Sequence, residues 1–113
     1  MTQGIKTMVY PTRDAAQAKA LISIVAGVAP HTDQPYYVGW NVDGQEIGLN
    51  PNGFEQGAAG PVAYWHVADV EATFAELLAA GATAVQQPTD VGGGALIATV
   101  ADSDGNVIGL RAA

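Results

Sequence analysis

The second half of this chain repeats the pattern of its first half. Residues 43–49 have the sequence D-G-Q-E-I-G-L and residues 104–110 have the sequence D-G-N-V-I-G-L, which agree at five of seven positions. Each copy ends a similar series, in which an apolar segment is followed by an Asp, an Ala- and Leu-rich stretch and a Gly. Short repeats of this kind cannot bury their apolar faces alone. We therefore expect one domain of two packed modules, at about residues 1–57 and 58–113.

Residues that favour helix ends and turns mark the same order of elements in both modules. Asp14 and Asp69 are suited to cap helices, and Gly27 and Gly81 are suited to end them. The D-G pair at residues 43–44 is a strong hairpin signal. The expected strands are residues 5–10, 36–42, 45–49, 62–67, 84–87, 96–101 and 107–110, the expected helices are residues 15–26 and 70–80, and residues 30–35 are expected to form a polar loop. This order predicts an α+β fold.

The composition excludes several classes of partner and chemistry. Lys and Arg number 4 against 11 Asp and Glu, so the net charge is −7 and both nucleic acid and anionic membrane surfaces are disfavoured. The sequence has no Cys, which excludes thiolate catalysis and Cys-ligated metal centres. Residues 1–10 lack the apolar core of a secretory signal, and the apolar stretch at residues 20–29 is too short to cross a bilayer. We expect a cytoplasmic protein.

Three stretches carry a family resemblance. They are I-K-T-M-V-Y at residues 5–10 leading into Asp14, V-A-D-V at residues 67–70, and A-D-S-D-G-N-V-I-G-L at residues 101–110. In these stretches the sequence resembles the vicinal oxygen chelate (VOC) superfamily of glyoxalase I, bleomycin-resistance proteins and extradiol dioxygenases, with Ser103 in place of the family's usual Pro. The resemblance implies two tandem βαβββ modules that form a curved mixed sheet around a concave cavity.

The resemblance also identifies four positions at which the metal enzymes of the family hold their ion. Here these positions carry Thr7, Gly48, Val62 and Gly109, none of which offers an imidazole or a carboxylate. Divalent metals need several such donors close together. We therefore expect no metal and no cofactor. If the strand register differs from this alignment by a residue or two, Glu46 and His66 are the nearest donors.

Strand alternation indicates which side chains face the implied cavity, because successive residues of a strand point to opposite faces. Trp40 is added to this set for the aromatic surface it would offer a flat ligand. The expected ligand-binding residues are Thr7, Val9, Trp40, Glu46, Gly48, Asn50, Val62, Tyr64, His66, Gly109 and Arg111.

Three of these residues are candidates for catalysis, each beside a purely structural interpretation. His66 is either a structural imidazole or a general base, since histidine titrates near neutral pH. Glu46 is either a solvated carboxylate at a hairpin end or an acid, base or counter-charge for a cationic ligand. Tyr64 either orients a ligand or lines the wall. His31, in a loop with Asp33, is expected to lie on the surface.

The leading hypothesis for function is a metal-free binding protein for a small organic molecule, aromatic or cationic. The alternative is a VOC-family enzyme of the lyase, isomerase or dioxygenase type. Such an enzyme would depend on a metal if the register differs, or would use His66 as a general base without a metal.

The first predicted helix carries more apolar side chains than one face can bury. Leu21, Ile22, Ile24 and Val25 cover more than one face of residues 15–26. One face packs on the sheet, and exposed apolar patches usually mark a partner surface. We therefore expect a homodimer.

Overall fold

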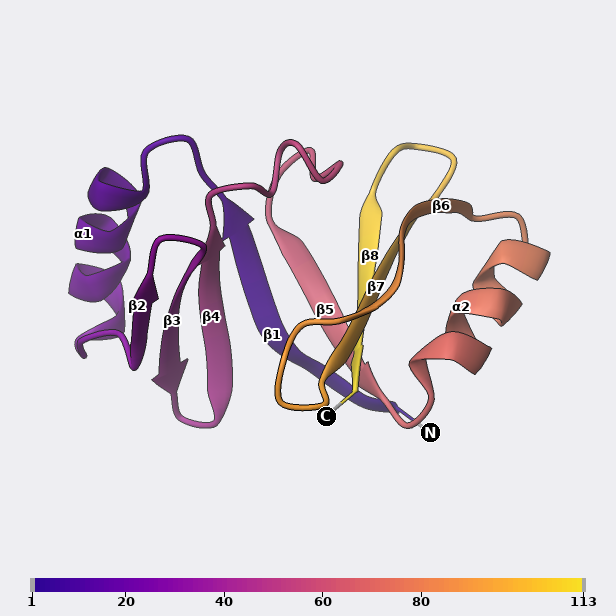
Figure 1. Ribbon diagram of the computed structural model, residues 1–113, viewed down its shortest axis with the longest axis horizontal. Helices are drawn as coiled ribbons and strands as arrows, with labels where there is room; N and C mark the ends of the chain where they lie inside the picture. The colour runs from indigo at the N-terminus through magenta and orange to yellow at the C-terminus, as the bar shows by residue number, and fades with distance from the viewer. Residues whose placement is uncertain (1, 113) are drawn as a thin grey trace.

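The computed structural model describes residues 2–112, which form two helices and eight strands. All eight strands belong to one sheet, in the order β2-β3-β4-β1-β5-β8-β7-β6 (Figure 1). The elements of the first half are β1 (Thr2–Pro11), α1 (Ala15–Ala26), β2 (Thr32–Gln34), β3 (Tyr37–Val42) and β4 (Gln45–Asn50). Those of the second half are β5 (Val62–Val67), α2 (Val70–Ala79), β6 (Thr83–Asp90), β7 (Leu96–Ala101) and β8 (Val107–Ala112).

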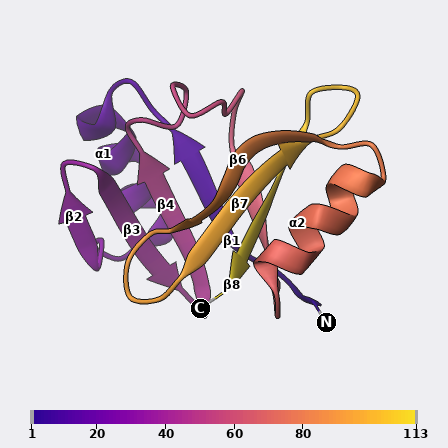
Figure 2. The ribbon, with the colours of Figure 1, turned by 45° about the vertical axis from the view of Figure 1, so that its right-hand side comes forward.

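The two halves have the same topology and meet at the centre of the sheet. In each half the first strand lies parallel to the last, β1 with β4 and β5 with β8, while the remaining neighbours are antiparallel. β1 and β5 join the halves as an antiparallel pair, in which Thr7 faces Tyr64 and Val9 faces Val62. The sheet is mixed and curved but not closed, as predicted from the family resemblance (Figure 2).

Each helix covers its own end of the sheet and builds its own core. α1 packs on β3 and β4, where Val38, Trp40 and Leu49 are buried. α2 packs on β6, β7 and β8, and its Val70 and Phe74 are buried. The other buried members of this second core are Ala98, Val100 and Leu110. With the helices on one face, the opposite face of the curved sheet is left for a cavity.

The helix caps are those that the sequence predicts. The Asp14 carboxylate accepts a hydrogen bond from the Gln17 backbone N–H at 3.1 Å, and the Asp69 carboxylate accepts one from the Ala72 N–H at 3.0 Å. Each satisfies a donor that a helix start otherwise leaves unpaired. Gly27 ends α1 in the left-handed conformation, with φ of 73°.

The two copies of the D-G motif make different turns. Asp43 and Gly44 both have positive φ, 52° and 82°, which is the type I′ geometry of tight hairpins. In the second copy the Asp102 carboxylate organises the loop instead. It accepts hydrogen bonds from the backbone N–H groups of Asp104 and Asn106, both at 2.9 Å. The Asn106 hydrogen bonds lower the pKa of Asp102. This stretch of the family resemblance therefore has a structural role.

Several segments differ from the sequence predictions, among them β1, which runs from Thr2 to Pro11 where a strand was expected at residues 5–10. Residues 32–34 were expected to be a loop but form β2, which pairs with β3 and is tied to α1 by a Lys19–Asp33 ion pair. An edge strand with one neighbour does not require apolar alternation, so its polar sequence hid it. β6 is also longer than the expected strand at residues 84–87, and two register shifts interrupt its pairing with β7. Within residues 2–112, neither helix is long and apolar enough to cross a membrane.

Candidate functional site

A cavity of about 500 Å³ lies on the face of the sheet opposite the helices. Residues from both halves line it, so it depends on the β1–β5 junction. From the first half come Thr7, Val9, His31, Tyr36, Tyr37, Glu46, Asn50, Asn52 and Gln56. From the second half come Tyr64, Gln86, Val91, Gly92, Ile97 and Arg111. Cavities of this size hold small organic ligands in other proteins.

The Glu46 carboxylate is held by two partners. The His31 Nε2–H donates to it, at 2.8 Å from Oε1 and 3.0 Å from Oε2, and the Tyr37 hydroxyl donates to Oε2 at 2.6 Å. His31 Nδ1 lies 2.7 Å from the Thr32 hydroxyl, which fixes the orientation of the ring. Burial and the adjacent Glu46 carboxylate raise the pKa of Tyr37, so its phenol stays protonated and remains a donor. The carboxylate is thus a paired, half-buried group in the cavity wall.

His66 is joined to Thr7 rather than to Glu46. Thr7 Oγ1 lies 2.8 Å from His66 Nε2, across the β1–β5 junction. Burial and the positive charges of Arg111 and Lys6 lower the pKa of His66, so the imidazole is neutral at pH 7. Thr7 lines the cavity, whereas His66 is not among the lining residues. The hydrogen bond to the Thr7 hydroxyl therefore links His66 to the cavity wall.

Three glycines make room for tyrosine rings that cover the sheet. A Cβ added at Gly48 would lie 2.5 Å from the Tyr37 Oη and 2.6 Å from its Cε1. A Cβ at Gly39, the cross-strand neighbour of Gly48, would lie 2.7 Å from Tyr37 Cε2. In the second half, a Cβ at Gly109 would lie 2.6 Å from Tyr64 Cδ1. In each half a tyrosine ring therefore lies directly over a glycine of the last strand.

Gly48 and Gly109 occupy two of the four positions that the family resemblance assigns to a metal. The other two carry the Thr7 hydroxyl, which is bonded to His66, and the alkyl side chain of Val62. Within residues 2–112 there is no cluster of three or more His, Asp or Glu side chains that could hold a metal ion. The donors present therefore do not fit the family's metal centre.

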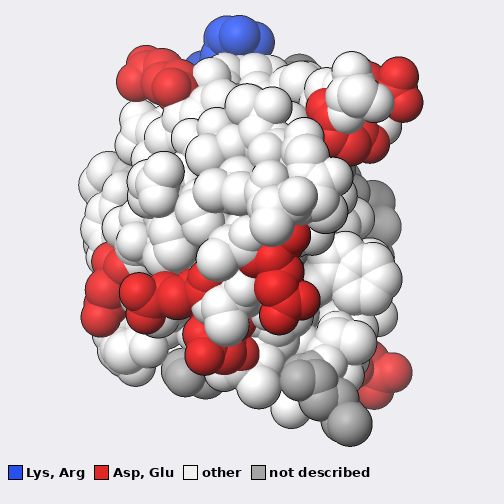
Figure 3. Space-filling model, turned by 90° about the vertical axis from the view of Figure 1, so that its right-hand side faces the viewer, with Lys and Arg blue, Asp and Glu red and all other residues white. Residues whose placement is uncertain are grey.

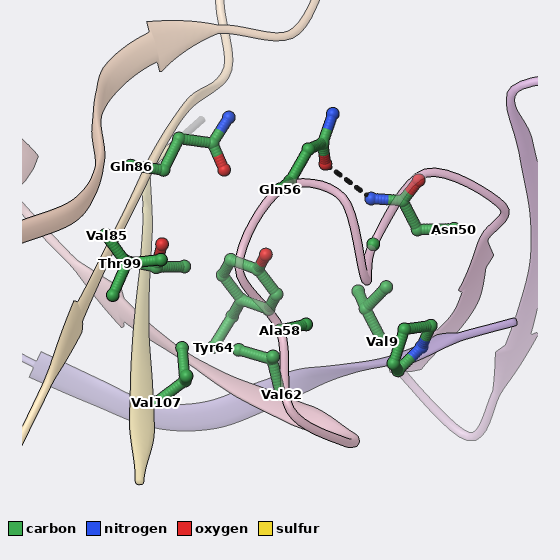
Figure 4. A pocket seen from close by; sticks show the side chains of 12 residues that line it. Val9, Asn50, Gln56, Ala58, Val62, Tyr64, Val85, Gln86, Thr99 and Val107 are labelled. Carbon is green, nitrogen blue, oxygen red and sulfur yellow. Dashed lines mark hydrogen bonds between the residues drawn. The ribbon is translucent and has the colours of Figure 1, made fainter. Parts of the chain in front are cut away.

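A second, much smaller pocket adjoins the cavity beneath Tyr64 (Figure 4). Its volume of about 20 Å³ is room for one water molecule. Val62 and Val107 form part of its wall, and the carboxamides of Asn50, Gln56 and Gln86 lie at its upper side in this view, with Asn50 Nδ2 donating to Gln56 Oε1 at 2.8 Å. These amides also line the main cavity, so they offer uncharged donors and acceptors there.

The structure places the predicted ligand-binding residues in three groups. Thr7, Val9, Glu46, Asn50, Tyr64 and Arg111 line the cavity. Gly48 and Gly109 lie under the tyrosine rings, Val62 lines the small pocket, and His66 is hydrogen-bonded to Thr7. Trp40 was misplaced: its side chain is fully buried in the α1 core, where its indole N–H donates to the Ser23 hydroxyl at 3.2 Å.

The reason for the Trp40 error is the alternation of β3. Trp40 pairs with Ile47, and both pack under α1, so Gly39 and Asn41 belong to the opposite face. His31 was expected on the surface, but it lines the cavity and binds Glu46. Tyr37 was not among the expected ligand-binding residues. The Gly39–Gly48 pair leaves the space in which the Tyr37 ring lies, close enough for its hydroxyl to bind Glu46. Two glycines on adjacent strands are a sequence signal that could have predicted this position.

A family model described as Glyoxalase/Bleomycin resistance protein/Dioxygenase superfamily matches residues 5–110. The chain belongs to this superfamily. No curated protein sequence matches it.

Solved structures of the superfamily share the fold at low sequence identity. A superfamily member from Vibrio splendidus 12B01 is 14% identical with a TM-score of 0.71, and the alignment covers 100% of both chains. A variant methylmalonyl-CoA epimerase of Streptomyces coelicolor, in complex with 2-nitronate-propionyl-CoA, is 15% identical with a TM-score of 0.71 over 100% of this chain and 99% of that chain. The Mn(II)-bound glyoxalase of Novosphingobium aromaticivorans is 18% identical with a TM-score of 0.71, and the match covers 98% of this chain but 39% of that chain.

The contact between Gly48 and Tyr37 predicts a coupled effect on stability. We expect Gly48→Ala to lower the free energy of unfolding by about 1–3 kcal/mol, because the new methyl group forces the Tyr37 ring to move. In a Tyr37→Ala background the same change should cost much less. Urea denaturation of the two single variants and the double variant measures this coupling.

Gly60→Ala is the matched control, since a Cβ there meets no atom within 4 Å. It should change stability by no more than about 0.5 kcal/mol. Additive effects of Gly48→Ala and Tyr37→Ala would contradict the described packing.

Proposed function

We propose that this protein binds a small organic molecule in its cavity without a metal ion, and that an aromatic group of the ligand provides most of the contact. The observation that supports this proposal most directly is the pair of rings, Tyr37 over Gly48 and Tyr64 over Gly109. Where the family's metal enzymes place ligand side chains, this chain has glycines covered by phenol rings. The space that a metal centre would occupy is thereby given to a flat apolar surface.

The shape and composition of the cavity support the same proposal. Its volume of about 500 Å³ suits a drug-sized molecule, and Tyr36, Tyr37 and Tyr64 supply aromatic walls. Aromatic rings favour offset or edge-to-face contact with a flat ligand at little cost in side-chain entropy. The amides of Asn50, Gln56 and Gln86 add directional hydrogen bonds.

A cationic ligand has less support than an aromatic one. The carboxylate that would attract it is Glu46, which already accepts hydrogen bonds from His31 and Tyr37. A ligand cation would have to displace one of these donors or share the carboxylate with them. The negative net charge of −7 still attracts cations at long range, so cationic aromatic compounds belong in the binding test.

A second candidate is a metal-free enzyme that transfers protons. The observation in its favour is the Glu46–His31 pair in the cavity wall, because a carboxylate and an imidazole are the commonest acid–base groups. The hypothesis that His66 is the general base has less support, because its Nε2 is hydrogen-bonded to the Thr7 hydroxyl. Exchange of a carbon-bound ligand proton with solvent deuterium, abolished by Glu46→Gln, would favour the enzyme over the binding protein.

A thermal-shift screen of chelator-treated protein tests the binding proposal. We expect neutral or charged aromatic compounds to raise the melting temperature, since a ligand that binds only the folded state stabilises it. Addition of Mn²⁺, Ni²⁺ or Zn²⁺ should leave the melting temperature unchanged. A metal-induced rise, or no response to any aromatic compound, would contradict the proposal.

Two tyrosine variants provide a matched comparison for that screen. Tyr36→Ala removes an exposed ring that lines the cavity, whereas Tyr10→Ala removes a half-exposed ring outside it. The ligand-induced shift should fall in the first variant and persist in the second.

We also propose that two copies associate through α1. Leu21, Ile24 and Val25 on this helix are 56%, 78% and 87% exposed, and Val28 follows beyond its end at 47%. These four exposed apolar residues lie on or next to α1, and α1 lies at the end of the molecule opposite α2 (Figure 1). We call them the α1 patch. A second copy of the same patch would bury it symmetrically, as in most homodimers. Other members of the family are often dimers.

Light scattering on a size-exclusion column tests this association. We expect twice the chain mass of 11.5 kDa at micromolar concentration, and the single mass for Val25→Glu. Ala79→Glu, which adds the same charge to the exposed end of α2, should leave the dimer intact. A mass near 11.5 kDa for the unchanged chain would contradict the proposal.

A further inference from the structure

Arg111 is the basic residue whose positive charge the described structure leaves uncompensated in the cavity. The ion pairs among residues 2–112 are Lys19–Asp33 and His31–Glu46, and neither involves Arg111. The other two basic residues lie elsewhere: Lys6 Nζ donates to the side-chain Oε1 of Gln3 at 3.3 Å, and Arg13 stacks 3.8 Å above the Phe54 ring. Arg111 alone of the four lines the cavity, where it is half-buried.

The position of Arg111 on β8 gives it a polar and aromatic setting. It pairs in register with His66 on β5 and with Ile97 on β7, and Ile97 also lines the cavity. Arg111, Tyr37 and Tyr64 line the same cavity. Burial raises the pKa of both phenols, and the positive charge of Arg111 acts in the opposite direction. A half-buried guanidinium without a carboxylate partner is costly to maintain unless an anion binds to it.

We propose that Arg111 is an anion subsite of this cavity and that the ligand is a flat aromatic acid, whose carboxylate binds the guanidinium while its ring lies against the tyrosines. This inference rests on the proposed function and specifies the ligand class. A planar carboxylate matches the fork of an arginine side chain with two parallel hydrogen bonds. The Glu46 carboxylate does not take this role for Arg111, because it is bonded to His31 and Tyr37 and makes no ion pair with the guanidinium.

The negative net charge of the chain does not oppose an anion at this subsite. Acidic side chains are spread over the outer surface at the α2 end of the molecule (Figure 3). Charges at the surface are screened over about 8 Å at physiological ionic strength. Inside the cavity the local balance is different, since Glu46 is paired and Arg111 is not.

Three compounds with the same ring system test the inference: naphthoate, naphthamide and naphthylmethylammonium. They present a carboxylate, a neutral amide and a cation to the same aromatic walls. By calorimetric titration we expect naphthoate to bind at least tenfold more tightly than the other two. Arg111→Gln should weaken naphthoate binding by about ten- to a hundredfold, as for the loss of a charge-assisted hydrogen bond, and leave naphthamide binding within about twofold.

Two control variants separate the charge from its geometry and its place. Arg111→Lys keeps the charge but loses the fork, so its affinity for naphthoate should lie between those of the unchanged chain and Arg111→Gln. Arg13→Gln removes an arginine that stacks on Phe54 outside the cavity, and it should leave the preference for naphthoate unchanged.

A spectroscopic measurement places the carboxylate independently of affinity. The charge of Arg111, together with burial and Lys6, holds the pKa of His66 below its usual value. A carboxylate bound at Arg111 offsets that charge, so an NMR titration should show the pKa of His66 rising with naphthoate and not with naphthamide. In Arg111→Gln the pKa should be raised already, and naphthoate should add nothing.

The possible results distinguish this inference from the proposal on which it rests. If naphthamide or the ammonium compound binds as tightly as naphthoate, or if Arg111→Gln retains naphthoate affinity, the anion subsite is wrong and the aromatic cavity stands. If no compound of the three binds, the proposed function fails for this ligand class and the subsite fails with it.

Discussion

The antiparallel pairing of β1 with β5 is the contact on which the rest of this structure depends. Each half has its own helix and its own buried core, but the cavity is lined by residues of both halves. Pairing Thr7 with Tyr64 and Val9 with Val62 brings the concave faces of the halves together. The junction therefore decides both that the halves form one sheet and that Glu46 and Arg111 share one cavity. The two halves repeat in sequence, but they contribute different charged groups to the shared cavity, Glu46 from the first half and Arg111 from the second.

The glycines of the last strand in each half link the repeat to the function that we propose. Gly48 and Gly109 are part of the same repeated I-G-L motif, and each carries a tyrosine ring over its Cα. The two rings come from different places, since Tyr37 lies on β3 and Tyr64 lies on β5. Both copies of the repeat thus leave space above a glycine, and a tyrosine from a different strand of each half fills that space. The result is an aromatic surface at positions where other members of the superfamily hold a metal.

Of two charged groups in the cavity, the Glu46 carboxylate has hydrogen-bond partners and the Arg111 guanidinium has no ion-pair partner among the described residues. The Glu46 carboxylate has two donors within 3.0 Å, and the phenol of Tyr37 is kept protonated beside it. Arg111 has no carboxylate partner among the described residues and lies beside a neutral His66. We propose that such a site recognises an anion with its arginine and a ring with its tyrosines. Such a site could bind an anion although the net charge of the protein is negative.

Much of the fold could be predicted from residues 5–10, 43–49 and 104–110, because strand, turn and repeat signals are local. Caps such as Asp69 were equally local. Contacts between strands, and the face to which a strand side chain points, could not be predicted from local signals. Trp40 was expected in the cavity and lies under α1, since one position of alternation in a strand reverses the face. His31 was expected at the surface, because nothing in a linear sequence shows that β2 brings it to Glu46, fifteen residues away.

A crystal structure combined with elemental analysis of the same crystals is the sharpest test of a metal-free aromatic cavity. We expect the Tyr37 and Tyr64 rings to lie over Gly48 and Gly109, and no stoichiometric divalent metal in protein purified without a chelator. A metal held by Glu46 with His31 or His66, and the tyrosine rings turned away from the glycines, would contradict it and restore metal chemistry as the function of the cavity.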